Sequence, residues 1–291
     1  MPRLHAVRSL LYIPGNRPRF FLKLAELRPD VAILDLEDAV PEAEKSAARD
    51  TVRAALPTIA RPDLGVFVRM NVTASGLARD DVARVVSPAL DGIVIPKVET
   101  ADDVRQVATW LDLAECDGGL ASGSIKLIAI LETVRGALNA CSIAQADSRL
   151  LGLAFGSEDF SRDLGVERTP EGVETLYPRS QVALAAHASG LQAFDTPWTD
   201  IADVEGLRRE TIQGRQLGYG GKQVIHPSQI ELVHQALRPS AEQIQWAKRA
   251  IEAYEGAVRD GRGAIQLDSK LLDVPMIERA RRTLAQAGES N

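Results

Sequence analysis

The chain has 291 residues and a formal net charge of −6 at pH 7. This acidic balance argues against a general nucleic-acid-binding protein, which needs a basic surface to displace counterions. The apolar part of the first residues is too short for a signal peptide, and no stretch approaches the ~20 apolar residues of a membrane span. We therefore expect a cytoplasmic protein that binds neither nucleic acid nor membranes.

Short aliphatic runs alternate with longer segments of helical period along most of the chain. The expected strands are Ser9–Ile13, Val31–Leu36, Gly65–Met70, Gly92–Pro96, Lys126–Leu131, Leu150–Phe155, Leu191–Asp195 and Gln223–His226. The expected helices between them are Arg17–Leu27, Pro41–Leu56, Thr100–Leu113, Val134–Ala144, Thr175–Ser189 and Ile201–Leu217. This alternation predicts an α/β fold and matches a (β/α)8 TIM barrel.

Several of the expected strands are apolar throughout, as in Leu127–Leu131 and Leu150–Phe155. Continuous apolar runs indicate parallel strands that are buried on both faces. A doubly wound open sheet is the alternative at this length. It predicts a GxGxxG loop after the first strand, whereas residues 13–18 read IPGNRP.

The last part of the chain exceeds what a barrel needs. Ala241–Val258 is amphipathic, a turn follows at Asp260–Gly263, and Ala264–Ala287 ends in a charged helix. We expect a barrel domain over residues 1–238 and a C-terminal helical extension over residues 239–291. The extension is expected to close the bottom, cover the top or reach a neighbouring subunit.

Polar residues gather where six of the expected strands end, which is the rim that carries the active site in a barrel. They are Asp35–Asp38, Arg69–Asn71, Pro96–Lys97, Glu132–Thr133, Gly156–Asp159 and Asp195–Pro197. This pattern predicts an active site at the rim without specifying the reaction.

Two carboxylates, Glu132 and Asp159, follow neighbouring strands that would lie about 5 Å apart. Such a pair is repulsive unless a cation lies between its members, and Mg²⁺ takes one or two protein carboxylates. Without His or Cys nearby, zinc is disfavoured. The alternative is that either residue forms an ion pair with Arg135 or Arg162.

Arginines at two of the predicted loops suit anionic ligands. Arg69 leaves the core at the rim and can bind a carboxylate through two hydrogen bonds, or it can form a salt bridge to Asp35 or Glu37. Residues 14–19, which include Asn16, Arg17 and Arg19, join a strand end to a helix start. That segment suits phosphate groups, although a proline there is equally an ordinary helix start.

The sequence resembles the citrate lyase β-subunit-like family within the HpcH/HpaI aldolase superfamily, over nearly its whole length. The matching stretches are Arg8–Arg17, Asp35–Val40 with Lys45, Val68–Asn71, Ile95–Glu99, Leu131–Gly136, Phe155–Phe160, Tyr177–Arg179, Ala193–Thr196, Gly221–Ile230 and Leu271–Arg282.

This resemblance implies a barrel that assembles as a homotrimer or a multiple of one. It implies Mg²⁺, or Mn²⁺, held by Glu132 and Asp159, with the substrate carboxylate bound by Arg69. Coenzyme A, carried as part of the substrate, would lie across the barrel mouth with its phosphates near Asn16–Arg19. The C-terminal segment of relatives brings an acidic residue to a neighbouring subunit's site, and the matching position is Asp273.

The activity implied is retro-Claisen cleavage of a malyl-, citramalyl-, methylmalyl- or citryl-CoA thioester into an acyl-CoA and a 2-oxo acid. Asp273 is then the candidate general acid or base. Glu37 and Asp38 would orient Arg69 or metal-bound water, and Lys97 would contact the substrate.

Three alternatives stay open. The chain can be the β subunit of a multi-component citrate lyase that acts on an acyl-carrier-protein thioester, a metal-dependent free-acid aldolase, or a metabolite-binding regulatory protein. In the family resembled, such β subunits often carry Asn at the position of His226, whereas Ile-His-Pro favours a stand-alone enzyme. The presence of Asp273 places the regulatory protein last.

Overall fold

The computed structural model describes Leu4, residues 6–259 and residues 264–288. The turn expected at Asp260–Gly263 lies outside these residues. The chain divides into two compact units, Met1–His234 and Gln235–Asn291. Within the described residues, no helix combines the length and the apolar character needed to span a bilayer.

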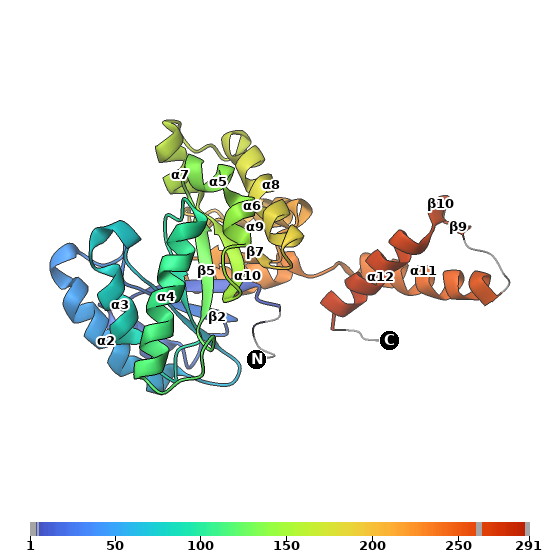
Figure 1. Ribbon diagram of the computed structural model, residues 1–291. Helices are drawn as coiled ribbons and strands as arrows, with labels where there is room; N and C mark the ends of the chain where they lie inside the picture. Colours follow the sequence, from blue (N-terminus) through green and yellow to red (C-terminus); the bar gives the residue numbers. More distant parts are fainter. Residues whose placement is uncertain (1–3, 5, 260–263, 289–291) are drawn as a thin grey trace. The chain divides into compact units, whose positions relative to one another are not determined.

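Eight parallel strands of the first unit form a closed barrel in chain order, with the eighth paired to the first (Figure 1). They are β1 (Ser9–Pro14), β2 (Val31–Asp35), β3 (Gly65–Arg69), β4 (Gly92–Ile95), β5 (Lys126–Leu131), β6 (Leu150–Phe155), β7 (Gln192–Asp195) and β8 (Gly221–Val224). The predicted (β/α)8 fold is confirmed, and the doubly wound alternative is wrong. The eighth strand begins two residues earlier than predicted because Gly221 and Lys222 pair with Phe194 and Asp195 of β7.

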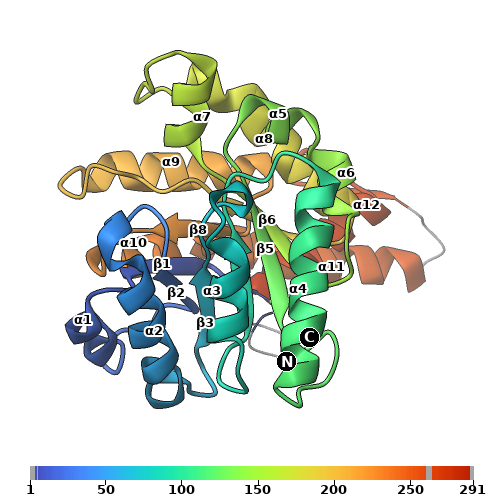
Figure 2. The ribbon, with the colours of Figure 1, turned by 60° about the vertical axis from the view of Figure 1, so that its left-hand side comes forward.

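Helices surround the strands, and Figure 2 shows α2, α3 and α4 side by side on the outside of the barrel. The helices of this unit are α1 (Pro18–Lys23), α2 (Lys45–Ile59), α3 (Ala78–Val85), α4 (Ala101–Asp117), α5 (Val134–Leu138), α6 (Ala140–Ala144), α7 (Ser157–Leu164), α8 (Val173–Ala188), α9 (Val204–Leu217) and α10 (Ser228–Leu237). The single helix expected over Val134–Ala144 is divided at Asn139. The helices α3, α7 and α10 were not predicted, because they are short and α3 and α7 are rich in charged residues.

Aliphatic and aromatic side chains fill the barrel. Ile33, Phe67, Ile128 and Phe194 from β2, β3, β5 and β7 are 0% exposed and pack in one cluster. Complete burial of such a side chain contributes about 1.5–3 kcal/mol. The apolar runs of the sequence therefore supply a rigid core, and the polar residues that follow each run emerge at its carboxyl-terminal rim.

Beyond the end of α10, the described part of the second unit contains two helices, α11 (Ala241–Arg259) and α12 (Val274–Gln286), which pack against each other. Between them lies a hairpin of β9 (Ile265–Leu267) and β10 (Lys270–Leu272) that the sequence did not predict. Ile251, Leu272 and Ile277 belong to a separate buried cluster. The expected C-terminal helices are therefore present, and they have a small core of their own.

Candidate active site

A cavity of about 400 Å³ opens at the carboxyl-terminal ends of the strands. The ends of β1, β2, β3, β5 and β8, the first turn of α7 and the loop after β7 contribute to its wall. Its polar lining residues are Tyr12, Asp35, Asp38, Arg69, Glu132, Ser157, Glu158, Asp159 and Gln223. The rim predicted from the sequence is thus the place where these side chains meet.

Arg69 lies against an acidic wall. The register of β2 and β3 sets it directly beside Asp35, and its Nε and Nη2 donate to the two Asp35 oxygens at 2.7 and 2.6 Å. Its Nη1 lies 2.8 Å from Glu37 Oε2, and its guanidinium stacks on the Tyr12 ring at 5.0 Å. Burial opposes ionisation of Asp35, but Arg69 holds the pKa of that carboxyl below its usual value. The salt bridge considered for Arg69 is therefore present.

Asp38 and Lys97 extend this cluster beyond Arg69 and Glu37. Burial raises the pKa of Glu37, whose side chain contacts the Lys97 ammonium group. Asp38 is largely exposed and lies 3.5 Å from Arg69 and 3.7 Å from Lys97. Lys97 adopts a φ of 50°, a left-handed conformation that few residues other than glycine adopt, and its backbone N–H donates to Glu132 at 2.9 Å. Lys97 thus connects the Arg69 cluster to Glu132.

Glu132 follows β5 and is only 4% exposed. Burial, reinforced by the negative charge of Asp159, raises the pKa of Glu132 to about 8. Asp159 lies in the first turn of α7 and forms an ion pair with the exposed Arg162. Arg135 instead lies 3.7 Å from Glu99. The predicted ion-pair alternative is therefore present for Asp159, whereas no Lys or Arg of the described residues forms an ion pair with the buried Glu132 carboxylate.

The composition of this cluster suits a hard divalent cation. The cluster contains more acidic than basic side chains. Its basic members are Arg69 and Lys97, while Arg162 is exposed to solvent. Its five acidic members are Asp35, Glu37, Asp38, Glu132 and Asp159. Among the described residues, no group of three or more His, Cys, Asp or Glu side chains could hold a metal ion. Mg²⁺ is usually bound by one or two protein carboxylates while water and substrate oxygens complete its octahedron, so a pair of carboxylates suffices for it.

Gly156 makes room for Glu132. The register pairs Leu131 of β5 with Phe155 of β6, so the next residues, Glu132 and Gly156, lie side by side. A Cβ atom at Gly156 would lie 2.5 Å from Glu132 Oε2 and 2.7 Å from its Cβ. Only glycine therefore leaves the Glu132 carboxylate in its position at the cavity.

Several residues predicted for the site lie outside this cavity lining. Asn16 donates to Glu44 at 2.6 Å, and Arg17 and Arg19 are exposed beyond Pro14, which does line the cavity. Asp273 belongs to the second unit, where its Oδ1 caps α12 by accepting from Met276 N at 3.1 Å. Asp273 thus makes a helix-capping contact, which its sequence position did not indicate.

Other residues of this rim were missed. Arg179 in α8 is 1% exposed and donates to both oxygens of Asp195 at 2.8 and 2.7 Å, so Asp195 is buried in an ion pair rather than available at the rim. Tyr12 donates to Gln223 at 2.7 Å in the cavity floor. A usable signal was the position of Tyr12 inside the mainly apolar strand β1, whereas Gln223 follows Lys222 and stands out less.

The sequence matches the family described as HpcH/HpaI aldolase/citrate lyase over residues 8–227. The chain belongs to this family. The match covers all eight barrel strands and every rim residue described above. Because this is a family of lyases, the predicted enzyme class, a carbon–carbon lyase, is confirmed.

Known members of the HpcH/HpaI family resemble the chain along nearly its full length. Citrate lyase subunit beta of Haemophilus influenzae is 38% identical over 96% of both chains. A (3S)-malyl-CoA thioesterase of Cereibacter sphaeroides is 38% identical over 97% of this chain and 95% of its own. The structure of CitE from Mycobacterium tuberculosis, in complex with magnesium, acetoacetate and coenzyme A, is similar with a TM-score of 0.82 and 34% identity, over 98% of this chain and 100% of the other.

Proposed function

We propose that the protein is a Mg²⁺-dependent lyase that cleaves a 3-hydroxyacyl-CoA thioester into an acyl-CoA and a 2-oxo acid. The observation that carries this proposal is the meeting of Arg69 with the Glu132–Asp159 pair in one cavity. The family relative solved with magnesium, acetoacetate and coenzyme A supports the choice of ligands.

Glu132 and Asp159 are the residues that would hold Mg²⁺, or Mn²⁺ in its place. When bound, the cation supplies Lewis-acid stabilisation of the alkoxide that develops on the substrate. The raised pKa of Glu132 supports this assignment, because a cation beside the carboxylate would compensate for burial and for the charge of Asp159.

Arg69 binds the carboxylate of the 2-oxo acid part in this mechanism. A guanidinium has five N–H groups, and Asp35 accepts two of them along one edge, so donors on Nη1 and Nη2 remain. Asp35, Glu37 and the Tyr12 ring hold the guanidinium plane in place. This fixed orientation lowers the entropy lost when the reacting bond is aligned.

The reaction begins when a base removes the proton from the substrate's 3-hydroxyl group, and we assign this step to the Asp273 carboxylate, which thereby gains the proton that it later delivers. The bond between the hydroxyl-bearing carbon and the thioester α-carbon then breaks, which leaves the 2-oxo acid and the enolate of the acyl-CoA. We assign to Asp273, reaching the cavity from a neighbouring subunit, the delivery of this proton to the α-carbon of that enolate. Glu37 and Asp38 orient Arg69. Lys97, whose ammonium group contacts Glu37, would also contact the substrate, and the coenzyme A phosphates would lie near Asn16, Arg17 and Arg19.

This function is tested by incubating the purified protein with Mg²⁺ and a panel of malyl-, citramalyl-, methylmalyl- and citryl-CoA, and by trapping the 2-oxo acid that is released. We expect release from at least one thioester and its loss in EDTA. Release from the free hydroxy acids alone would instead identify a free-acid aldolase.

The second candidate is a β subunit that acts on an acyl-carrier-protein thioester. It is favoured by the similarity to the relative named citrate lyase subunit beta. His226, which follows β8 beside the cavity-lining Ile225, favours the stand-alone enzyme by the resemblance discussed above. Turnover that appears only after a carrier-protein thioester is supplied would establish this second candidate.

Asp273→Asn separates catalysis from capping. Asparagine caps helices as well as aspartate does, so the stability of the protein should change by less than about 0.5 kcal/mol. Asparagine cannot deliver or accept the proton, and we expect kcat to fall by about 10²- to 10⁴-fold. Turnover and thermal unfolding are measured together, with Asp268→Asn, a substitution in the nearby hairpin, as the matched control. Full turnover in Asp273→Asn would remove this residue from the mechanism.

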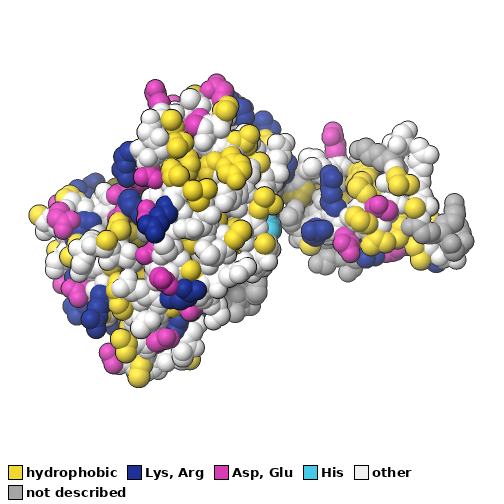
Figure 3. Space-filling model, turned by 45° about the horizontal axis from the view of Figure 1, so that its top comes forward, with side chains coloured by type: hydrophobic (Ala, Val, Ile, Leu, Met, Phe, Trp, Pro, Cys, Tyr) yellow, Lys and Arg dark blue, Asp and Glu magenta, His cyan; other side chains and the backbone are white. Residues whose placement is uncertain are grey.

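We also propose that the protein assembles as a homotrimer or a multiple of one. Large hydrophobic side chains gather on the barrel unit (Figure 3), and those exposed on α5 and α8 are Leu138, Val173, Leu176, Tyr177 and Leu184. Light scattering should give the mass of three chains or a multiple. Leu184→Glu should lower that mass, whereas Leu22→Glu on α1, which is 78% exposed, should not. A monomeric wild-type protein would contradict this assembly.

A further inference from the structure

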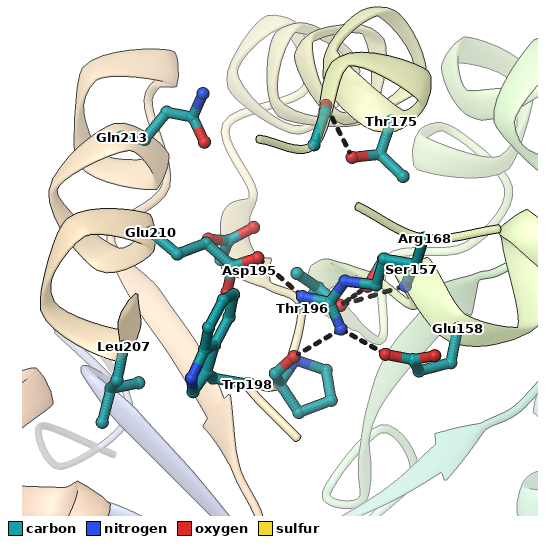
Figure 4. Close-up of polar contacts among 12 residues, drawn as sticks. Ser157, Glu158, Arg168, Thr175, Asp195, Thr196, Trp198, Leu207, Glu210 and Gln213 are labelled. Atoms are coloured by element: carbon teal, nitrogen blue, oxygen red, sulfur yellow. Dashed lines mark hydrogen bonds and ion pairs between the residues drawn. The ribbon is translucent and has the colours of Figure 1, made fainter. Parts of the chain in front are cut away.

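Arg168, between α7 and α8, joins the cavity wall to the outer helices (Figure 4). Its Nη1 donates to Glu158 Oε1 at 2.5 Å and to the Pro197 carbonyl at 3.2 Å, and both partners line the cavity. Its Nη2 donates to Glu210 of α9 at 2.6 Å. The Arg168 side chain is only 12% exposed, so it is built into the wall rather than lying on the surface.

The contacts of Arg168 form part of a closed ring. Glu210 accepts at 2.6 Å from the buried Lys222, which also donates to the Thr196 carbonyl at 2.6 Å. The Thr196 hydroxyl accepts from the backbone N–H of Ser157 at 3.0 Å. Ser157 precedes Glu158, so the ring returns to its starting point. Ser157 is therefore held by Thr196 from the loop after β7, and Glu158 is held by Arg168, which in turn contacts Glu210 of α9.

Glu158 is the third carboxylate at this side of the cavity. It lines the cavity together with Glu132 and Asp159, and about half of its side chain is exposed. Without Arg168 it would carry an unpaired negative charge next to the candidate cation ligands. In the structure its Oε1 points to Arg168 instead, as Figure 4 shows.

We propose that Arg168 is a positioning residue that withholds the Glu158 carboxylate from the cation and so sets the preference of the site for Mg²⁺ over Ca²⁺. The inference rests on the proposed function, because it takes Glu132 and Asp159 as the cation ligands. Mg²⁺ binds through one or two carboxylates and keeps several waters, whereas Ca²⁺ takes six to eight oxygens and gains from each added carboxylate. Releasing a third carboxylate therefore favours Ca²⁺.

The test measures binding of Mg²⁺ alone and of Ca²⁺ alone by titration calorimetry, with no substrate present. In Arg168→Met we expect the ratio of the Ca²⁺ to the Mg²⁺ association constant to rise by about tenfold or more. In the double variant Glu158→Gln with Arg168→Met the ratio should return to within about twofold of the wild-type value. Arg162→Met removes the same charge from the exposed partner of Asp159 and should leave the ratio unchanged.

A purely structural role for Arg168 predicts weaker binding of both ions, an unchanged ratio and no reversal in the double variant; this result would overturn the inference. Glu158→Gln alone provides a check should Arg168→Met not fold. Because Glu158 is already withheld, this variant should bind Mg²⁺ with wild-type affinity, and a loss would show Glu158 to be a ligand and overturn the proposal. If the wild-type protein binds neither ion, the proposed function is overturned together with this inference. That outcome differs from an unchanged ratio in Arg168→Met, which overturns the inference alone.

Discussion

Glu132→Gln is expected to make the metal-free protein more stable and to abolish its stabilisation by Mg²⁺. Burial and the charge of Asp159 raise the pKa of Glu132 to about 8 in the folded state. Each unit of such a shift costs about 1.4 kcal/mol when the group ionises. Glutamine keeps the shape and can still accept from the Lys97 N–H, but it carries no charge to bury. We expect a gain of at least about 2 kcal/mol at pH 8–9 in EDTA, or about 4 °C in Tm.

The stability of the metal-free protein should depend on pH in one definite direction. Between the ordinary pKa of a glutamate and about 8, the folded state holds a proton on Glu132 that the unfolded state has lost. Stability of the metal-free protein therefore falls as the pH rises through this window and levels off above about 8. A bound cation must displace that proton, so Mg²⁺ affinity should rise with pH over the same window.

These effects are measured by denaturation in EDTA and in saturating Mg²⁺ across pH 5–9. Wild-type protein should gain about 2.7 kcal/mol at a Mg²⁺ concentration of 100 times its Kd, and Glu132→Gln should gain almost nothing. Glu99→Gln, which neutralises a more exposed glutamate paired with Arg135, is the matched control and should behave as wild type. Equal Mg²⁺ stabilisation of Glu132→Gln and wild type would contradict the cation assignment.

Arg69→Lys is expected to lower kcat/KM by about a hundredfold or more, equivalent to about 2.7 kcal/mol. Lysine keeps the charge but cannot bind Asp35 through two parallel bonds and still offer donors to a substrate carboxylate. Asp35 is only 1% exposed, so the loss of its two hydrogen bonds to Arg69 should also lower the free energy of unfolding, by at most about 5 kcal/mol.

Inhibition measurements separate the binding role of Arg69 from its structural one. Inhibition by a free 2-oxo acid should be lost in Arg69→Lys, while inhibition by free coenzyme A should be retained. Arg135→Lys, in a pair whose members are both more exposed, is the control and should leave both inhibition constants unchanged. If the two ligands lost affinity equally, Arg69 would be a structural residue only.

The barrel and the positions of the rim residues were predictable from local features of the sequence. Continuous apolar runs identify strands that are buried on both faces, and a polar residue directly after such a run must emerge at the rim. Arg69, Glu132 and the turn that holds Asp159 were found in this way. Their roles as ligands stay predictions, since sequence position specifies location and residue chemistry but not the partner of each group.

Which charged side chains pair with one another became evident only from the folded structure. The ion pairs of Arg69 depend on the register of β2 against β3, and the raised pKa of Glu132 depends on its burial beside Asp159. Arg168, Glu210 and Lys222 come from a loop, a helix and a strand that are separated along the chain, so no local pattern joins them. Hydrophobic periodicity is a property of residues that are neighbours along the chain, so the strands could be located without the fold. Electrostatic pairing depends on distances across the closed barrel, and only the folded chain sets those distances.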